Sequence, residues 1–306
     1  MASEVLMKAV KDLLSSPMYI ASPELLKKTC WKPCDGFQMN KLYLTPETED
    51  QPLIEATVEW IAQISYEGFK LFPCGGYTDR FSKKFEDTRA SAITVSPRHP
   101  ALRPAWNDVI AAVKAIEASK SATTGVESRG IQNHLAITLE GSNQQGIRIR
   151  HQLFLPIENM VEQPDDEQQV KELQERNRER WNLTTWPGKD HAAKYGLDKL
   201  LDDGRYSPNP FAAVDANGKT IPPAQWEKSL KGVDVLVKAV IVHQWYGKGR
   251  EKRDNFYADI RSVTVLHSFA DGAPAAKGTA EKRKAGDEVL EGDPKGKRPA
   301  RGRNTD

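Results

Sequence analysis

The chain has 306 residues, of which 39% are hydrophobic and 28% are charged, and its 44 basic and 42 acidic side chains leave a net charge of +2. No apolar run approaches the ~20 residues that a membrane-spanning helix needs, and the first residues lack the basic-then-apolar pattern of a secretory signal. We therefore expect a soluble protein that is not secreted and that meets any polyanion through a local basic patch, because overall attraction is weak.

The three cysteines, Cys30, Cys34 and Cys74, are an odd and small number. They predict free thiols in a reducing compartment, because a disulfide framework uses cysteines in pairs. As zinc ligands they would need a fourth partner at a familiar spacing, and none is evident. We expect no metal site and no cofactor.

The first 120 residues mix short helical and strand patterns. Spacing of apolar residues and turn signals predict helices over 2–15, 22–29 and 104–119, and strands over 37–44 and 91–96. Residues 51–72 fit a helix and a strand equally well, and the pattern leaves both open.

Two further strand patterns, 131–140 and 146–157, follow a polar segment at 121–130. Alternation in the second strand separates an apolar face from a face that carries Arg148 and Arg150. A strand face with two arginines is a candidate nucleic-acid surface. The alternative is an ordinary solvated face of a sheet.

Residues 163–201 are predicted to form a helical insert, with one helix from Pro164 to about Arg180 and a second over 192–201. The acidic run 165–167 at the start of the first helix superficially resembles a nuclease carboxylate cluster. Stabilisation of the positive helix end explains it better, since carboxylates that hold a metal normally converge from sheet strands.

Gly218-Lys219-Thr220 imitates the end of a phosphate-binding P-loop. Ala213 stands where the earlier glycine is required, and Pro222-Pro223 would prevent the following helix, so we reject a nucleotide-hydrolysing site. Asn217-Gly218 instead predicts a tight turn. No nucleophile stands at motif spacing from a base, and we expect a protein that is not an enzyme.

The pattern that dominates the chain is 231–267, in which an alternating run over 233–242 and a second over 256–265 flank a glycine-containing loop. Two such runs predict a β-hairpin. Cations at the tip and aromatics beside it suit a surface that binds a single strand, because charges follow phosphates and rings stack on bases. The alternative is a solvated loop whose neighbouring aromatics fill the core. The tip cations are Lys248, Arg250, Lys252 and Arg253.

Consecutive strand residues point to opposite faces, which separates the aromatics of this hairpin into two sets. Continuing the buried alternation places Trp245 and Phe256 on the core side. Tyr246 and Tyr257 are then the exposed candidates for stacking on bases.

The order of features over 209–266 supplies a resemblance. An Asp-x-Asn-Gly-Lys turn at 215–219 precedes Gly232-Val233-x-Val235-x-Val237, and a hairpin follows that ends in Val263–Leu266. This order resembles the C-terminal half of phage-type (T7-like) single-stranded-DNA-binding proteins with an OB-fold. The resemblance implies a curved barrel that presents aromatics and cations to a single strand.

We therefore expect an α+β protein with an OB-like β-barrel or a curved antiparallel sheet. Residues 1–120 are expected to form a region of mixed helices and strands that could pack on the barrel. Residues 121–269 form the β-rich domain, with the helical insert 163–201, and 270–306 form a disordered basic tail. The predicted function is non-catalytic binding of single-stranded nucleic acid, with DNA favoured over RNA. The alternative is a structural or protein-interaction domain. The predicted binding residues are Tyr246, Lys248, Arg250, Lys252, Arg253, Tyr257, Arg148 and Arg150.

The tail 270–306 is rich in glycine, alanine, proline and charge, a composition typical of disorder. It contains two basic clusters that resemble a bipartite nuclear-import signal. We expect a nuclear protein and an import receptor as a partner, against the alternative of a merely solvated tail. The cluster residues are Lys282, Arg283, Lys284, Lys297 and Arg298.

Overall fold

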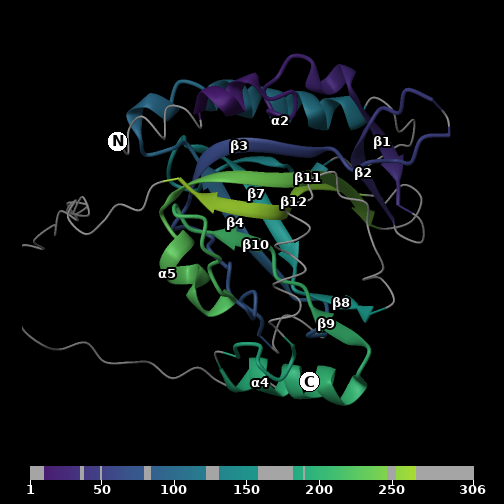
Figure 1. The fold of residues 1–306 in the computed structure, drawn as a ribbon, viewed down its shortest axis with the longest axis vertical. Coiled ribbons are helices and arrows are strands. Elements are labelled where there is room, and N and C mark those ends of the chain that lie inside the picture. Colours follow the sequence, from purple (N-terminus) through teal and green to yellow (C-terminus); the bar gives the residue numbers. More distant parts are fainter. Residues whose placement is uncertain are drawn as a thin grey trace, which may run out of the picture. The chain divides into compact units, whose positions relative to one another are not determined.

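The structure, a computed structural model, describes residues 10–34, 38–48, 50–78, 84–121, 131–157, 182–188, 190–246 and 253–266. All of these residues belong to one compact unit, Met1–Phe269. The architecture is α+β, with one large sheet and few helices, as expected (Figure 1). Within the described residues, no helix is both long and apolar enough to span a membrane.

The elements have the following bounds. The strands are β1 (Thr29–Pro33), β2 (Met39–Leu44), β3 (Thr57–Ile64), β4 (Arg89–Val95), β5 (Ile131–Asn133), β6 (Ala136–Thr138), β7 (Gln145–Gln152), β8 (Phe154–Pro156), β9 (Tyr206–Pro208), β10 (Ala212–Val214), β11 (Asp234–Tyr246) and β12 (Arg253–Val265). The helices are α2 (Trp106–Ser121), α4 (His191–Asp203) and α5 (Trp226–Leu230), with a short helix at 10–15 and 3-10 turns η1 (Leu25–Lys27), η2 (Pro100–Leu102) and η4 (Pro223–Gln225).

Five strands of the sheet pair in a circuit. β11 pairs with β3, β3 with β4, and β4 with β7, all antiparallel. β7 then pairs parallel with β12, and β12 pairs antiparallel with β11, which returns to the first strand. We call β3, β4, β7, β12 and β11 the strand circuit. β5 and β10 also pair parallel with β12, so the sheet is mixed and not wholly antiparallel.

Alternate side chains of the strand circuit point into a shared apolar core. Trp60 of β3, Ile149 of β7, Val237 of β11 and Phe256 of β12 are all buried in one hydrophobic cluster. Burial of each such side chain contributes about 1.5–3 kcal/mol. The alternating patterns predicted over 146–157 and 233–242 therefore set the inner face of the circuit.

A β-bulge in β12 changes which residues face inward. Lys238 of β11 pairs with Ser262, whereas the next residue, Ala239, pairs with Ile260, so Arg261 is the extra residue. The residues of β12 that belong to the hydrophobic core are accordingly even-numbered up to Ile260 and odd-numbered from Val263 onward.

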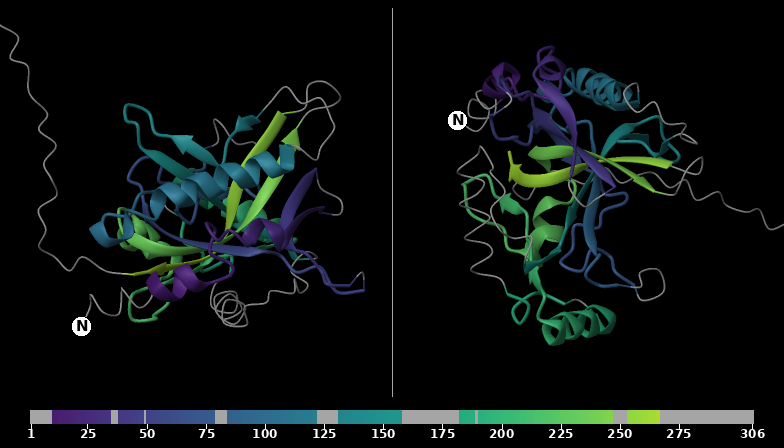
Figure 2. Two further views of the ribbon diagram at one scale, coloured as in Figure 1. Left: turned by 90° about the horizontal axis from the view of Figure 1, so that it is seen from above. Right: turned by 90° about the vertical axis from the view of Figure 1, so that its right-hand side faces the viewer.

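Helices cover the circuit on two sides (Figures 1 and 2). α2 lies on one side and buries one face of its surface, whereas α4, α5 and the β8–β9 pair lie on the other side. An aromatic cluster fills the second side, and Phe211 and Trp226 stack there with ring centroids 4.1 Å apart. The buried apolar residues of α2 are Trp106, Val109, Ile110, Val113 and Ile116.

Several sequence predictions are confirmed. The helices expected over 104–119 and 192–201 are α2 and α4. The strand expected over 37–44 contains β2, the strand expected over 91–96 overlaps β4, and the hairpin of 231–267 is β11–β12. The ambiguous segment 51–72 contains a strand, β3. Trp60 and its inward neighbours in β3 alternate with half-buried residues, which is the period of a strand.

Other predictions are wrong or lie outside the described residues. The helix expected over 22–29 is only the 3-10 turn η1, because Thr29 already begins β1 and pairs with Leu44 of β2. The strand expected over 131–140 is divided into β5 and β6, and that over 146–157 into β7 and β8. The helix expected from Pro164 to Arg180 and the tail 270–306 lie outside the described residues.

Candidate nucleic-acid interface

The outer face of the strand circuit gathers arginines from two neighbouring strands. Arg148 and Arg150 of β7 alternate with buried residues and so point away from the core. Arg150 pairs in register with Ser91 of β4, and Arg89 lies two residues from Ser91 on the same face of β4. On the other side of β7, β12 contributes Tyr257 to this face. We call Arg89, Arg148, Arg150 and Tyr257 the arginine face.

Arg150 and Tyr257 form the centre of the arginine face. The guanidinium carbon of Arg150 lies 3.6 Å from the centroid of the Tyr257 ring, which is the geometry of a cation–π contact. Burial raises the pKa of Tyr257, and the neighbouring Arg150 opposes that rise. Burial, followed by the like charge of Arg89, lowers the pKa of Arg150. The two arginines lie on the paired strands β4 and β7, and their like charges repel each other.

Arg148 is held at the edge of this face by Asn133, which is itself held by Asn255. Its Nη1 donates to Oδ1 of Asn133 over 2.9 Å, and Asn133 donates in turn to Asn255 of β12. Both amides are neutral, so within the residues that the structure describes they orient the guanidinium of Arg148 and leave its charge uncancelled.

The hairpin end of β11 and β12 continues the surface. Tyr246 is 46% exposed, and its hydroxyl donates to Gln244 Oε1 over 2.6 Å. Arg253, its register partner on β12, is also exposed. The expected exposure of Tyr246 is confirmed. Lys248, Arg250 and Lys252 lie outside the described residues, as do the nuclear-import residues Lys282, Arg283, Lys284, Lys297 and Arg298.

Tyr257 corrects the expectation of an exposed ring. Its side chain does lie on the outer face, but the residue is only 7% exposed. β12 is flanked by β7 and β11 along this stretch, and Arg150 covers the face of the ring. Phe256, expected on the core side, is 1% exposed, which is confirmed. Trp245 is half-buried and stacks on His243 with ring centroids 5.7 Å apart.

The base of the hairpin is fixed by His243. Its Nε2 lies 2.8 Å from Oδ1 of Asp254 and its Nδ1 lies 3.2 Å from the side-chain nitrogen of Asn40. An amide nitrogen only donates, so Nδ1 of His243 accepts a hydrogen bond from Asn40. Nε2 therefore carries the hydrogen and donates it in a hydrogen bond to Asp254. Burial lowers the pKa of His243, although Asp254 works in the opposite direction. A neutral imidazole therefore joins β2, β11 and β12 beneath the tip.

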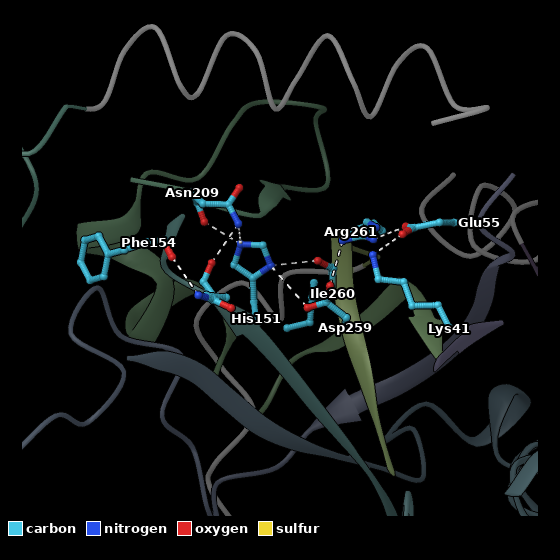
Figure 3. A network of polar contacts seen from close by, with 9 residues as sticks. Lys41, Glu55, His151, Phe154, Asn209, Asp259, Ile260 and Arg261 are labelled. Carbon is cyan, nitrogen blue, oxygen red and sulfur yellow. Dashed lines mark hydrogen bonds and ion pairs between the residues drawn. The ribbon is translucent and has the colours of Figure 1, made fainter. Parts of the chain in front are cut away.

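A second charged group on the outer face of β12 has its charges cancelled. Glu55 forms ion pairs with both Lys41 and Arg261, and Arg261 Nη1 also donates to Asp259 Oδ2 over 2.9 Å. We call Lys41, Glu55, Asp259 and Arg261 the paired cluster (Figure 3). Burial raises the pKa of Glu55, but Arg261 and Lys41 outweigh it and hold that pKa below its ordinary value.

Next to the paired cluster, His151 lies on the inner face of β7 and ties three segments together. Its Nδ1 lies 3.0 Å from the carbonyl of Ile260 and its Nε2 lies 2.6 Å from the carbonyl of Asn209 (Figure 3). Burial lowers the pKa of His151. The ring packs edge-on against Phe211. This histidine serves the packing of β7 against β12 and the segment after β9, and does not reach the arginine face.

Arg89, Asn133 and Asn255 belong to this surface but are absent from the sequence predictions. Arg89 stands at the start of a strand that was expected to begin at 91, and its alternation with buried Ala90 and Ala92 is the pattern that could have found it. The two asparagines have no such local pattern. Among the residues that the structure describes, no group of three or more histidine, cysteine, aspartate or glutamate side chains could hold a metal ion.

Comparisons with known proteins give structural similarities only. No family model and no curated protein matches the sequence. The single-stranded DNA binding protein gp2.5 of bacteriophage T7 is similar with a TM-score of 0.33 and 11% identity, over 71% of this chain and 96% of that chain. The single-stranded DNA-binding protein of bacteriophage Enc34 is similar with a TM-score of 0.32 and 12% identity, over 84% of this chain and 98% of that chain.

A structure of the Enc34 protein in complex with single-stranded DNA is also similar, with a TM-score of 0.32 and 11% identity, over 71% of this chain and 96% of that chain. The resemblance to phage-type single-stranded-DNA-binding proteins expected from 209–266 is confirmed at this level of similarity. At such low TM-scores and identities, the similarities carry neither a fold assignment nor a ligand over to this chain.

Proposed function

We propose that this chain binds single-stranded nucleic acid, DNA in preference to RNA, without catalysing a reaction. The observation that carries the proposal is the arginine face. Arg89, Arg148 and Arg150 lie on neighbouring strands, and none of them forms an ion pair with a carboxylate among the described residues. Uncancelled cations that line a sheet, with an exposed tyrosine at its end, suit a flexible polyanion that carries flat bases.

The order of pairing supports an OB-like barrel as the scaffold. In chain order the strands of the circuit are β3, β4, β7, β11 and β12, and β7 and β12 form its parallel pair. OB-folds are five-stranded Greek-key barrels that bind oligonucleotides on the face of the second and third strands and with the loops after the first and fourth. By this fold-level analogy the binding face is that of β4 and β7, where the three arginines lie, and the fourth loop is 247–252.

The parts of this surface have different roles in the proposal. The arginines and the cations of 247–252 follow the phosphates, which makes affinity depend on salt. Tyr246, exposed at the end of β11, supplies a ring face for a base. The preference for DNA rests on the resemblance of 209–266 and is a separate point to test.

Fluorescence polarisation with labelled oligo-thymidylate at a series of salt concentrations tests the proposal. Changing Arg89, Arg148 and Arg150 together to glutamine should lower the slope of log K against log salt by about 2, at about 0.7 for each phosphate contact on a single strand. Arg103→Gln removes one positive charge from an exposed site that donates to backbone carbonyls before α2, and should leave the slope unchanged.

Two results would contradict the proposal. Absence of binding by the native chain would leave the structural or protein-interaction alternative. A slope that the triple variant shares with the native chain would remove the arginine face from the site. Competition by oligo-uridylate and by duplex DNA then measures the expected preference for single-stranded DNA.

We also propose, from the sequence of 270–306, that the protein is imported into a nucleus by a receptor that recognises its two basic clusters. Deleting 278–306 should leave the thermal midpoint of the remaining chain nearly unchanged and should abolish nuclear accumulation of a large reporter fusion. Persistent nuclear accumulation after the deletion would contradict this import signal.

A further inference from the structure

Arg150 is a largely buried cation whose donors are incompletely used. Its Nε and Nη2 are buried and have no hydrogen-bond partner among the described residues. Buried polar groups in native proteins nearly always have a partner, and exceptions commonly mark a place that a water molecule or an ion occupies. An unsatisfied guanidinium is more costly than a neutral group, because desolvation of a charge is larger.

The neighbouring side chains that the structure describes do not cancel this charge. Asp259 is the register partner of Arg150 on β12, but its carboxylate accepts from Arg261 over 2.9 Å and forms no ion pair with Arg150. Arg89, the other charged neighbour, adds a like charge that lowers the pKa of Arg150. Among the described residues, two cations and no carboxylate paired with them lie at this place, which favours an anion from outside the chain.

Tyr257 explains how the guanidinium is held there. The ring supports the guanidinium carbon at 3.6 Å and is itself almost fully buried. A stacked guanidinium keeps its donors in the plane of the group, so they remain directed away from the ring. Because Arg150 occupies that face of the ring, a nucleic-acid base cannot stack on the same face without displacing it.

We propose that Arg150 and Arg89 form a subsite for a backbone phosphate and that Tyr257 is a positioning residue, which holds the guanidinium of Arg150 and does not stack on a base. The subsite deepens the proposed function and rests on it. Its ligand class is the phosphodiester of the strand, so it reads charge and spacing and carries no preference for a particular base.

Polarisation measurements with oligo-thymidylate separate the two roles. Arg150→Gln should weaken binding about tenfold and lower the salt slope by about 0.7. Tyr257→Leu should produce the same fall in slope, and adding it to Arg150→Gln should change little more. Tyr257→Phe keeps the ring and should restore the native slope, a rescue that general loss of packing would not give. Circular dichroism and the thermal midpoint establish that each variant is folded.

The chemistry of the oligonucleotide distinguishes phosphate from base. With an abasic strand of the same length, the loss caused by Arg150→Gln should persist. With a methylphosphonate strand, whose backbone is neutral, the loss should disappear. If Tyr257→Leu weakens binding only of strands that carry bases and leaves the salt slope intact, Tyr257 stacks on a base and the proposal is overturned. If Arg150→Gln does not fold, Arg150→Lys, which keeps the charge without the planar stack, should bind more weakly with the native slope.

Inorganic tripolyphosphate tests the subsite independently of the proposed function. It should raise the thermal midpoint of the native chain and of Arg103→Gln more than that of Arg150→Gln, because only a ligand of the folded state stabilises it. Stabilisation by tripolyphosphate without any binding of oligonucleotide would support the anion subsite and contradict the proposed function. Equal stabilisation of the native chain and Arg150→Gln would overturn the subsite, even if oligonucleotide binds elsewhere.

Discussion

Two arginines on adjoining strands of the same outer face have opposite surroundings. Arg261 of β12 is paired with Glu55 and Asp259, and Glu55 also pairs with Lys41. Arg150 of β7 lies on Tyr257, with Arg89 nearby and no ion-paired carboxylate among the described residues. The paired cluster therefore contains its own counter-charges. The arginine face has an aromatic support for its charge and no neutralising partner within the described part of the chain.

This difference separates a structural role from the binding role that we propose. A buried charge that has its partner inside the chain becomes a liability only when the partner is removed. A guanidinium in a cation–π contact keeps its positive charge, because the ring is neutral, and it can still attract an external anion. Arg150 stands opposite Asp259 in the strand register, and Arg261 stands two residues after Asp259 on β12. The same residue type thus contributes to the fold at one position and has the proposed binding role at the other.

The largest expected effect is on the paired cluster. Glu55→Ala leaves Arg261 and Lys41 without their shared carboxylate and should lower the free energy of unfolding by about 3–5 kcal/mol. Urea unfolding measures it. Glu24→Ala breaks the exposed pair of Glu24 with Lys27 and should cause no measurable change, which makes it the matched control. A loss of stability as small as that of Glu24→Ala would remove the distinction between the paired cluster and the arginine face.

The aromatics of the hairpin sharpen the same contrast between fold and binding. Phe256→Ala should cost about 3–5 kcal/mol of stability, because the ring is fully buried. Tyr246→Ala should leave stability nearly unchanged and weaken oligonucleotide binding by about 1–3 kcal/mol if a base stacks there. Urea unfolding and polarisation of the same two variants give both values. Unchanged affinity in Tyr246→Ala would remove this ring from the site.

A smaller effect is expected on stability at the arginine face. Arg150→Gln removes a cation–π contact and also removes a poorly satisfied buried charge, and these changes oppose each other. The free energy of unfolding should therefore change by less than about 1 kcal/mol. A loss comparable with that of Glu55→Ala, measured in the same urea titration, would mean that Arg150 is a structural residue.

The smallest effect is a pH dependence confined to the paired cluster. Arg261 and Lys41 hold the folded-state pKa of Glu55 below its ordinary value, so its stabilising contribution is present above the unfolded-state pKa of about 4.3. That contribution is lost as pH falls through the folded-state pKa. The difference in unfolding free energy between the native chain and Glu55→Gln should shrink on acidification from neutral pH to below about 4. Subtracting the two free energies of unfolding cancels the pH dependence that buried His151 and His243 add to both proteins. A difference that stays constant with pH would contradict the lowered pKa of Glu55.

Local sequence determined the elements whose partners are near in the chain. Alternation over 233–242 and 256–265, with a glycine-containing connection, defined β11 and β12, and the apolar face of 104–119 defined α2. The Asn217-Gly218 turn is present, with Gly218 at a φ of 80°. Each of these depends on side-chain period or on a backbone angle that glycine tolerates, and both are readable over a few residues.

Only the tertiary structure decided what stands beside what on the outer face. The contact of Arg261 with Glu55 joins residues 206 positions apart, and Arg89 reaches Arg150 through the pairing of β4 with β7. Alternation correctly put Tyr257 on the outer face, but the register with β7 placed Arg150 over its ring and buried it. Period tells which way a side chain points, whereas its burial and its charge partners depend on the register of strands that are distant in sequence.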